Sequence, residues 1–92
     1  MLKFIVEFLG TFLFLSVVAA TTNPLLIALA LLTAIVLVGN ISGAHLNPAI
    51  STMFWVKGSL SNMDLIGYIV AQIFGGIAAL SAYKAFGGKS LI

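Results

Sequence analysis

The chain has 92 residues, of which 62% are hydrophobic and only 7% are charged, and it contains neither cysteine nor arginine. A water-soluble domain carries about a quarter charged residues, so this composition predicts a membrane protein. Its four scattered lysines, one histidine and two acids provide neither a nucleic-acid-binding patch nor an active site or metal centre, so we expect no catalytic residues, metal or cofactor.

The first predicted element is a membrane-spanning helix over residues 4–20. Its 17 residues carry one charge, that of Glu7, and about 17 to 25 apolar residues cross a bilayer as a helix. The alternative is a secretory signal peptide, with Lys3 as its positive region and small residues at its cleavage end. Glu7 argues against a signal peptide, because an acid is unfavourable in the apolar region of a signal peptide. In a membrane-spanning helix, by contrast, a carboxyl group is usually paired and functional. For Glu7 itself, the alternative is snorkelling to the nearby membrane surface beside Lys3.

A second membrane-spanning helix is predicted over residues 25–41. Asn23 followed by Pro24 is a helix start signal, because asparagine caps the first free N–H groups and proline suits the first helical position. Polar residues and a glycine mark the end of this helix, namely Asn40, Ser42 and Gly43. The connection between the first two helices is therefore very short.

Residues 48–56 predict a helix that enters the membrane without crossing it. Nine residues at about 1.5 Å each reach about 14 Å, roughly half of a hydrocarbon core about 30 Å thick. Asn47 and Pro48 repeat the start signal, and the non-helical backbone before them must line water or be buried in protein. The positive end of this half-helix would point toward the membrane centre, where it can hold a polar solute and repel a cation.

A third spanning helix is predicted over residues 65–83, after a polar turn at 58–62. Small residues recur along it every four positions, at Gly67, Ala71, Gly75 and Ala79. Such a face lets another helix approach closely, so we expect a helix partner there. The expected fold is an all-α membrane protein of one domain, residues 1–92, with three transmembrane helices and one re-entrant half-helix.

The string GNISGAHLNPAI at residues 39–50 is the most informative part of the sequence. It resembles the first signature, SGAHxNPA, of the aquaporin or major intrinsic protein family. The matching residues are Ser42, Gly43, Ala44, His45, Asn47, Pro48 and Ala49. EFLGTF at residues 7–12 is similar to the family's first-span motif, and its third-span pattern is similar to Tyr68, Ala71, Gln72 and Gly75. The family has two inverted repeats and the chain resembles one, so the resemblance implies an aquaporin-like half repeat.

The resemblance also implies a pore around this signature. Asn47 would donate its side-chain amide to a passing solute while backbone carbonyls of residues 43–45 accept from it, and together they replace the hydration that the solute loses in the pore. Glu7 and Gln72 would brace the loop by hydrogen bonds, and His45 would be a satisfied structural histidine rather than a ligand. The implied pore and solute-binding residues are Gly43, Ala44, His45, Asn47, Pro48 and Ala49.

Three isoleucines are expected at the constriction of this pore. The family commonly places an arginine and aromatic or histidine residues there, and this chain has no arginine. Ile50 follows the NPA sequence and Ile27 occupies the position of the second-span aromatic residue. Ile35 would stand at the fifth-span position if a second copy completed the pore. An apolar constriction passes water or small neutral solutes such as glycerol, or gates by dewetting.

These features predict a passive membrane channel for water or small neutral solutes, formed by oligomerisation of a half-aquaporin, and not an enzyme. The lysines divide evenly between the two sides, with Lys3 and Lys57 against Lys84 and Lys89, so no charge bias fixes one orientation. Two antiparallel copies would restore the inverted repeat, and the second copy would supply a helix for the small face. The expected partners are the bilayer, a second copy or another aquaporin half, and small neutral solutes, with no nucleic acid.

Two alternatives stay open at this point. The chain could be a fragment or an accessory, non-conducting subunit that packs against a full-length aquaporin. A small membrane-lesion or transporter-like protein would fit the length of the chain but would leave the SGAHLNPA string unexplained.

Overall fold

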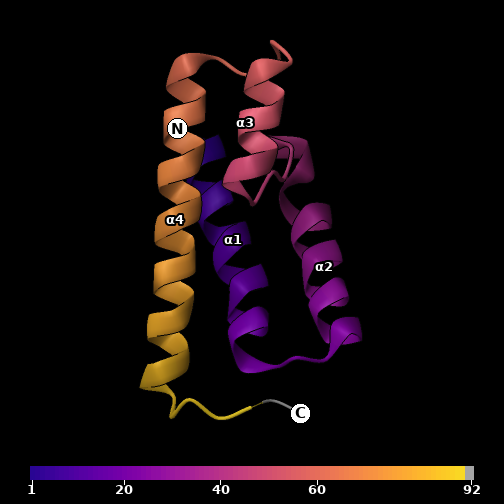
Figure 1. The fold of residues 1–92 in the computed structure, drawn as a ribbon, viewed down its shortest axis with the longest axis vertical. Helices are drawn as coiled ribbons and strands as arrows, with labels where there is room; N and C mark the ends of the chain where they lie inside the picture. The colour runs from indigo at the N-terminus through magenta and orange to yellow at the C-terminus, as the bar shows by residue number, and fades with distance from the viewer. Residues whose placement is uncertain (91–92) are drawn as a thin grey trace.

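The computed structural model describes residues 1–90, and this part of the chain forms four helices joined by loops (Figure 1). They are α1 (Leu2–Ala20), α2 (Pro24–Ser42), α3 (Pro48–Val56) and α4 (Asn62–Ala85). Three of them, α1, α2 and α4, are long and apolar enough to cross a membrane, whereas α3 has nine residues. The predicted all-α fold of three transmembrane helices and one half-helix is confirmed.

Polar side chains cap the first turns of α2, α3 and α4. Asn23 accepts hydrogen bonds from two backbone N–H groups of α2, and Asn47 accepts one from α3. A proline follows each of these caps, because the first helical position needs no N–H donor. Ser61 caps α4 by accepting from the Asp64 N–H at 3.1 Å. The start of α4 at Asn62 therefore precedes the predicted start, since this cap lies outside the apolar segment on which the prediction rests.

The re-entrant path of the chain places α3 beside the spanning helices. α1 packs against both α2 and α4, and α3 packs against the upper part of α4 (Figure 1). α1 and α4 run in the same direction and α2 runs opposite to them. After α2 the chain returns to the middle of the molecule, and α3 leads from there to the end where α4 begins. The amino-terminal end of α3 is thus held at mid-height.

The small-residue face of α4 packs against α1 of the same chain. A Cβ atom at Gly75 would lie 2.9 Å from the Phe8 carbonyl oxygen and 3.0 Å from the Thr11 Cβ. One at Gly67 would lie 2.5 Å from a carbon of the Phe4 ring. The other members of this face are buried too, namely Ala71 and Ala79. The expectation that a second copy supplies the helix for this face is therefore wrong, because side chains this small let α1 approach closely.

The apolar core is small and lies beside the loop between α2 and α3. It consists of Val6, Ala34, Val38 and Leu46. Many large apolar side chains are instead exposed, among them Leu32, Val36 and Phe74, at 56%, 70% and 58%. Large exposed apolar patches are rare on soluble monomers. This surface therefore fits the hydrocarbon region of a bilayer.

Candidate functional site

The break loop, residues 43–47, joins α2 to α3 and carries the predicted site. Three of its residues have positive φ angles: Gly43 at 88°, Ala44 at 50° and Leu46 at 56°. Glycine tolerates this conformation, but it costs a residue with a side chain about 1–3 kcal/mol. The break loop therefore needs support from side chains elsewhere in the fold.

The carboxylate of Glu7, on α1, provides that support. Its Oε2 accepts hydrogen bonds from the His45 backbone N–H at 3.0 Å and from Ser42 Oγ at 2.6 Å. Its Oε1 accepts from the Leu46 backbone N–H at 2.9 Å and from Gln72 Nε2 at 3.0 Å. The side chain is 0% exposed, and a carboxylate, which only accepts, suits four converging donors. Three elements are thereby tied to one point on α1.

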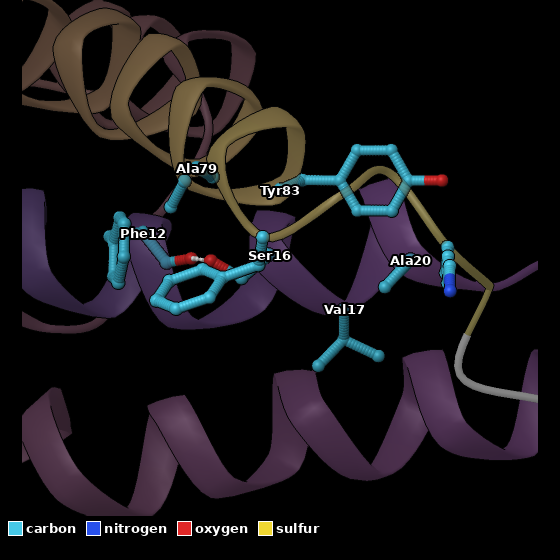
Figure 2. A pocket seen from close by; sticks show the side chains of 9 residues that line it. Phe12, Ser16, Val17, Ala20, Ala79 and Tyr83 are labelled. Atoms are coloured by element: carbon cyan, nitrogen blue, oxygen red, sulfur yellow. Dashed lines mark hydrogen bonds between the residues drawn. The ribbon is translucent and has the colours of Figure 1, made fainter.

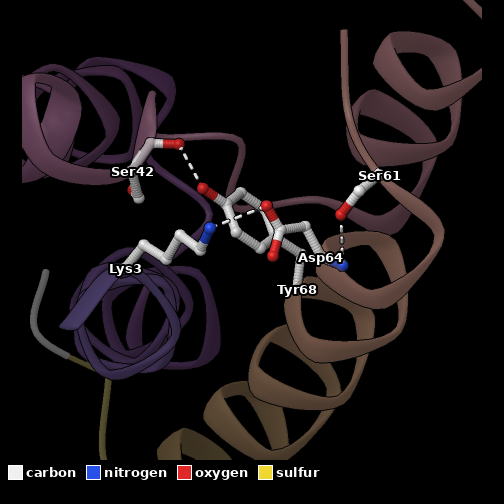
Figure 3. A network of polar contacts seen from close by, with 5 residues as sticks. All are labelled: Lys3, Ser42, Ser61, Asp64 and Tyr68. Carbon is white, nitrogen blue, oxygen red and sulfur yellow. Dashed lines mark hydrogen bonds and ion pairs between the residues drawn. The ribbon is translucent and has the colours of Figure 1, made fainter. Parts of the chain in front are cut away.

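A second set of polar contacts joins the helices above this point (Figure 3). Lys3 Nζ and Asp64 Oδ2 form an ion pair at 2.7 Å, which links the first turns of α1 and α4. Tyr68 Oη donates to the Ser42 carbonyl at 2.7 Å, which links α4 to the end of α2. The alternative in which Glu7 extends to the membrane surface beside Lys3 is therefore wrong, because Glu7 accepts hydrogen bonds from donors inside the protein and Lys3 forms its ion pair with Asp64.

The His45 ring is held between α3 and α4. Its Nδ1 lies 2.8 Å from Ser51 Oγ, which also accepts a 2.9 Å hydrogen bond from Gln72 Nε2. The Ser51 hydroxyl has one proton and two acceptor sites, so it can donate to Nδ1 or accept from it while it accepts from Gln72. The ring stacks on Phe54 and meets Tyr68 edge-on, each with centroids 4.9 Å apart. His45 is thus packed and hydrogen-bonded within the fold.

Ser51 is a supporting residue that the sequence did not single out. It is 0% exposed, and its hydroxyl forms hydrogen bonds both with the His45 ring and with the side-chain amide of Gln72 on α4. Its only signal is a hydroxyl in the otherwise apolar segment 48–56, and Thr52 gives the same signal. Thr52 is exposed and donates to the Pro48 carbonyl at 2.7 Å. Only the three-dimensional structure tells which of the two hydroxyls faces inward.

The break loop also presents polar groups that the rest of the protein does not use. The backbone N–H groups of residues 44–46 donate to Ser42 Oγ or to Glu7. No hydrogen bond within residues 1–90 engages the carbonyl groups of residues 43–46. Asn47 is exposed, and its Oδ1 caps α3 by accepting from a backbone N–H at 2.8 Å. Its side-chain NH2 group has no partner among these residues, so this NH2 group and four consecutive carbonyl groups are left without partners in the described part of the chain.

A groove of about 360 Å³ extends from the break loop along α1 and α4. Leu46 and Pro48 line it where α3 begins, and Thr11 and Gln72 line it from the two long helices. Thr11 Oγ1 and Gln72 Oε1 are buried, and neither has a hydrogen-bond partner in the described part of the chain. Leaving a buried polar atom unpaired costs about 1–3 kcal/mol. The groove therefore borders two buried polar atoms that residues 1–90 leave unpaired.

The remaining predicted site residues lie on two helices that do not meet. Pro48, Ala49 and Ile50 are exposed in the first turn of α3. Ile27 is half-buried and Ile35 is 43% exposed, both on α2. Within residues 1–90, α2 and α3 do not pack against each other. One chain thus does not bring the three isoleucines together, and a constriction built from them stays a prediction about more than one chain.

Related proteins point to one family. The family described as Major intrinsic protein matches residues 24–89. The chain is 42% identical over 95 aligned residues to glycerol uptake facilitator protein-like 6 of Lactiplantibacillus plantarum, covering 94% of this chain and 44% of that protein. It is 38% identical over 92 aligned residues to aquaporin Z of Photorhabdus laumondii, covering 84% and 40%. The chain thus spans less than half the length of either relative. No solved structure matches it.

Proposed function

The chain belongs to the major intrinsic protein family, and on this premise we propose that it forms half of a passive membrane channel for water or small neutral solutes. It is an integral, multi-pass membrane protein of a channel family, not an enzyme. One relative is named for glycerol uptake and the other as an aquaporin. Water and glycerol are therefore the two candidate solutes for this chain.

One observation carries the proposal: the break loop offers the free amide donor of Asn47 and the four unpaired carbonyl acceptors of residues 43–46. A polar solute that enters an apolar medium without new hydrogen bonds loses about 2–7 kcal/mol per group. A donor beside a run of acceptors offsets this loss for a solute that carries O–H groups. Because Glu7 already fixes the loop, the solute does not have to order it.

Ions are disfavoured by the same geometry. The amino-terminal end of α3 carries the positive end of the helix dipole, and it lies at mid-height in the fold (Figure 1). The one carboxylate close by, that of Glu7, is buried, and both of its oxygens already accept two hydrogen bonds each. A cation would therefore meet the positive end of a helix dipole and no free carboxylate. An anion would have to lose its hydration in an apolar environment, which is unfavourable.

We infer that a second copy in antiparallel orientation supplies the other half. The unpaired carbonyls and the Asn47 amide would face lipid in a lone chain, which a bilayer does not tolerate. The groove beside Pro48 borders the buried, unpaired oxygens of Thr11 and Gln72, and a second half would cover this groove. The lysines favour neither orientation, since Lys3 and Lys57 face one side and Lys84 and Lys89 the other. The alternative is a non-conducting subunit that packs against a full-length family member and fills the same groove.

Osmotic shrinkage of vesicles that contain only this chain tests the channel. Under an osmotic step the vesicles should shrink faster than protein-free vesicles of the same lipid, and a glycerol gradient should then decide whether glycerol follows water. If shrinkage is no faster than in empty vesicles, the autonomous channel is wrong. Co-purification with a full-length family member would then support the non-conducting alternative.

The orientation of the chain in the membrane tests the antiparallel pair. The chain has no cysteine of its own, so one can be added at either end and labelled with an impermeant thiol reagent on intact cells. In a dual-topology population each terminus should be labelled in part of the molecules. If every molecule has one orientation, the second half must come from another protein.

A further inference from the structure

A second cavity, of about 430 Å³, lies between the carboxyl-terminal halves of α1 and α4 (Figure 2). Phe12 and Val17 of α1 and Ala79 and Ala82 of α4 contribute apolar walls. No residue of the break loop lines it, and the channel proposed above makes no use of it.

A smaller cavity of about 220 Å³ adjoins the first and is polar. The two cavities share Ala20 and Tyr83. The smaller cavity is also lined by three residues with hydroxyl groups: Thr21, Thr22 and Ser90. Together the cavities form one groove, called here the end groove, with a long apolar part and a short polar part.

The segment after α4 is folded back over the end groove. Tyr83 Oη donates to the Gly88 carbonyl at 2.6 Å, and the Gly88 N–H donates to the Tyr83 carbonyl at 2.9 Å. These two bonds hold the next residue, Lys89, in the lining of the larger cavity. A lysine thus lines the apolar cavity where two spanning helices end.

Within residues 1–90, the charged side chains at this end of the molecule are lysines. Lys84 lies in the last turn of α4, and Lys89 follows five residues later. The sequence has two acidic residues, Glu7 and Asp64. Glu7 is buried under the break loop, and Asp64 pairs with Lys3 at the opposite end of the fold. An anion at the end groove would therefore meet Lys89 and no acidic side chain.

We propose that the end groove binds one anionic phospholipid, with an acyl chain in the apolar part and the headgroup phosphate at Lys89. The walls belong to transmembrane helices, so hydrocarbon chains of the bilayer are what reaches them. Lysine side chains at helix ends extend toward the headgroup layer, and basic residues there attract anionic lipids. The exposed hydroxyl of Thr22 in the polar part supplies a donor for the headgroup. This site is independent of the channel proposal, because it shares no residue with the break loop.

Lipid retention by the purified chain tests the site. Protein in mild detergent is mixed with equal amounts of phosphatidylglycerol and phosphatidylcholine, and the lipids that stay bound are counted by native mass spectrometry. We expect phosphatidylglycerol to be retained about fivefold more strongly, the factor that one lysine near a membrane surface provides. Lys89→Gln should abolish the preference and Lys89→Arg should keep it. Lys57→Gln, a matched change at the opposite end, should leave it unchanged.

Four outcomes overturn the proposal. Equal retention of the two lipids by the unmodified chain would remove the headgroup site, and an undiminished preference in Lys89→Gln would place it elsewhere. Filling the apolar part with Ala82→Phe should lower retention of both lipids while helix content by circular dichroism stays unchanged; unaltered retention would contradict the acyl-chain assignment. Disulfide-linked dimers of Ala82→Cys chains would show that a second copy covers the end groove instead. None of these results bears on water flux, so the two proposals fail separately.

Discussion

Glu7 Oε2 accepts a hydrogen bond of 3.0 Å from the backbone N–H of His45, which lies 38 positions further along the chain. The other oxygen of the same carboxylate binds the next backbone N–H, that of Leu46. A loop with three positive φ angles is thus held from the first helix rather than by its own sequence neighbours. The first predictions concern this dependence.

Replacing Glu7 with glutamine should destabilise the fold although the side chain keeps its size. One of the two oxygens becomes an NH2 group, so two of the four donors around it lose their acceptor. A buried donor without a partner costs about 1–3 kcal/mol. The midpoint of thermal unfolding in detergent should fall clearly. Asp64→Asn is the control, since it removes a partly exposed ion pair worth at most about 1 kcal/mol. Equal midpoints for the two variants would mean that Glu7 does not hold the loop.

Asn47→Asp should change permeation more than stability. Aspartate caps a helix as well as asparagine does, but it removes the amide donor and adds an anion at the membrane centre. Water flux through reconstituted vesicles should drop. Asn23→Asp is a matched control, because Asn23 also precedes a proline and caps a helix, but it lies outside the break loop. If flux and ion exclusion stay normal in Asn47→Asp, Asn47 is not part of the solute path.

Thr11→Val should separate folding from assembly. The Thr11 hydroxyl is buried without a partner within the described residues, so its replacement by a methyl group should not lower the unfolding free energy of the chain and should raise it by up to about 1–3 kcal/mol. If a second half donates to the groove, vesicle water flux should nevertheless fall. Ser51→Ala is the contrast, because it strips partners from His45 and Gln72. Normal flux in Thr11→Val would mean that nothing in the pore-forming assembly uses that hydroxyl.

Gly75→Ala should push α4 away from α1. The added Cβ would meet a backbone oxygen at 2.9 Å, and overpacking of this kind typically costs about 1–3 kcal/mol. Gly39→Ala adds the same methyl group to α2, where its nearest neighbour would be at 3.9 Å. The free energy of unfolding should therefore be lower for Gly75→Ala than for the parent chain. For Gly39→Ala it should equal or exceed that of the parent, since alanine favours helix by about 1 kcal/mol over glycine. The reverse order would contradict the close packing of the two helices.

No ionic current should accompany the water flux. In an antiparallel pair, two positive helix ends would meet at the midplane and repel cations. Recordings across planar bilayers that contain the chain should remain at the level of the protein-free membrane. Discrete current steps would show that ions find a path and would contradict the expected exclusion.

Local signals made most of the fold predictable. Asn23 with Pro24 and Asn47 with Pro48 start helices in the sequence and in the structure, because a cap and a proline act within one turn. The length of the segment 48–56 was enough to predict a helix that does not cross. The span boundaries moved outward by a few residues, because a paired Lys3 and a capped Asp64 can belong to helices whose apolar parts end earlier.

Relationships across the chain were not predictable in the same way. Periodicity showed that α4 has a small face, but it could not say that α1, rather than a second copy, covers it. The hydroxyl of Ser51 and the unpaired oxygens of Thr11 and Gln72 gain their meaning only from neighbours that lie far away in sequence. The end groove exists because two helices end together and the segment beyond folds back, which no single segment encodes.

The chain crosses three times, so the start of α1 and the end of α4 lie at opposite ends of the molecule (Figure 1). A second copy joined by a short linker would therefore begin on the side of the membrane where the first copy ends. Its three helices would cross in the opposite directions to those of the first copy. Tandem duplication of such a unit therefore yields two repeats of opposite orientation without any change to the sequence of either repeat. A chain with an even number of crossings would yield two copies of the same orientation. The odd count thus makes head-to-tail fusion and the antiparallel pair two routes to one arrangement, and joining two copies of this chain covalently would lock each half into a single orientation.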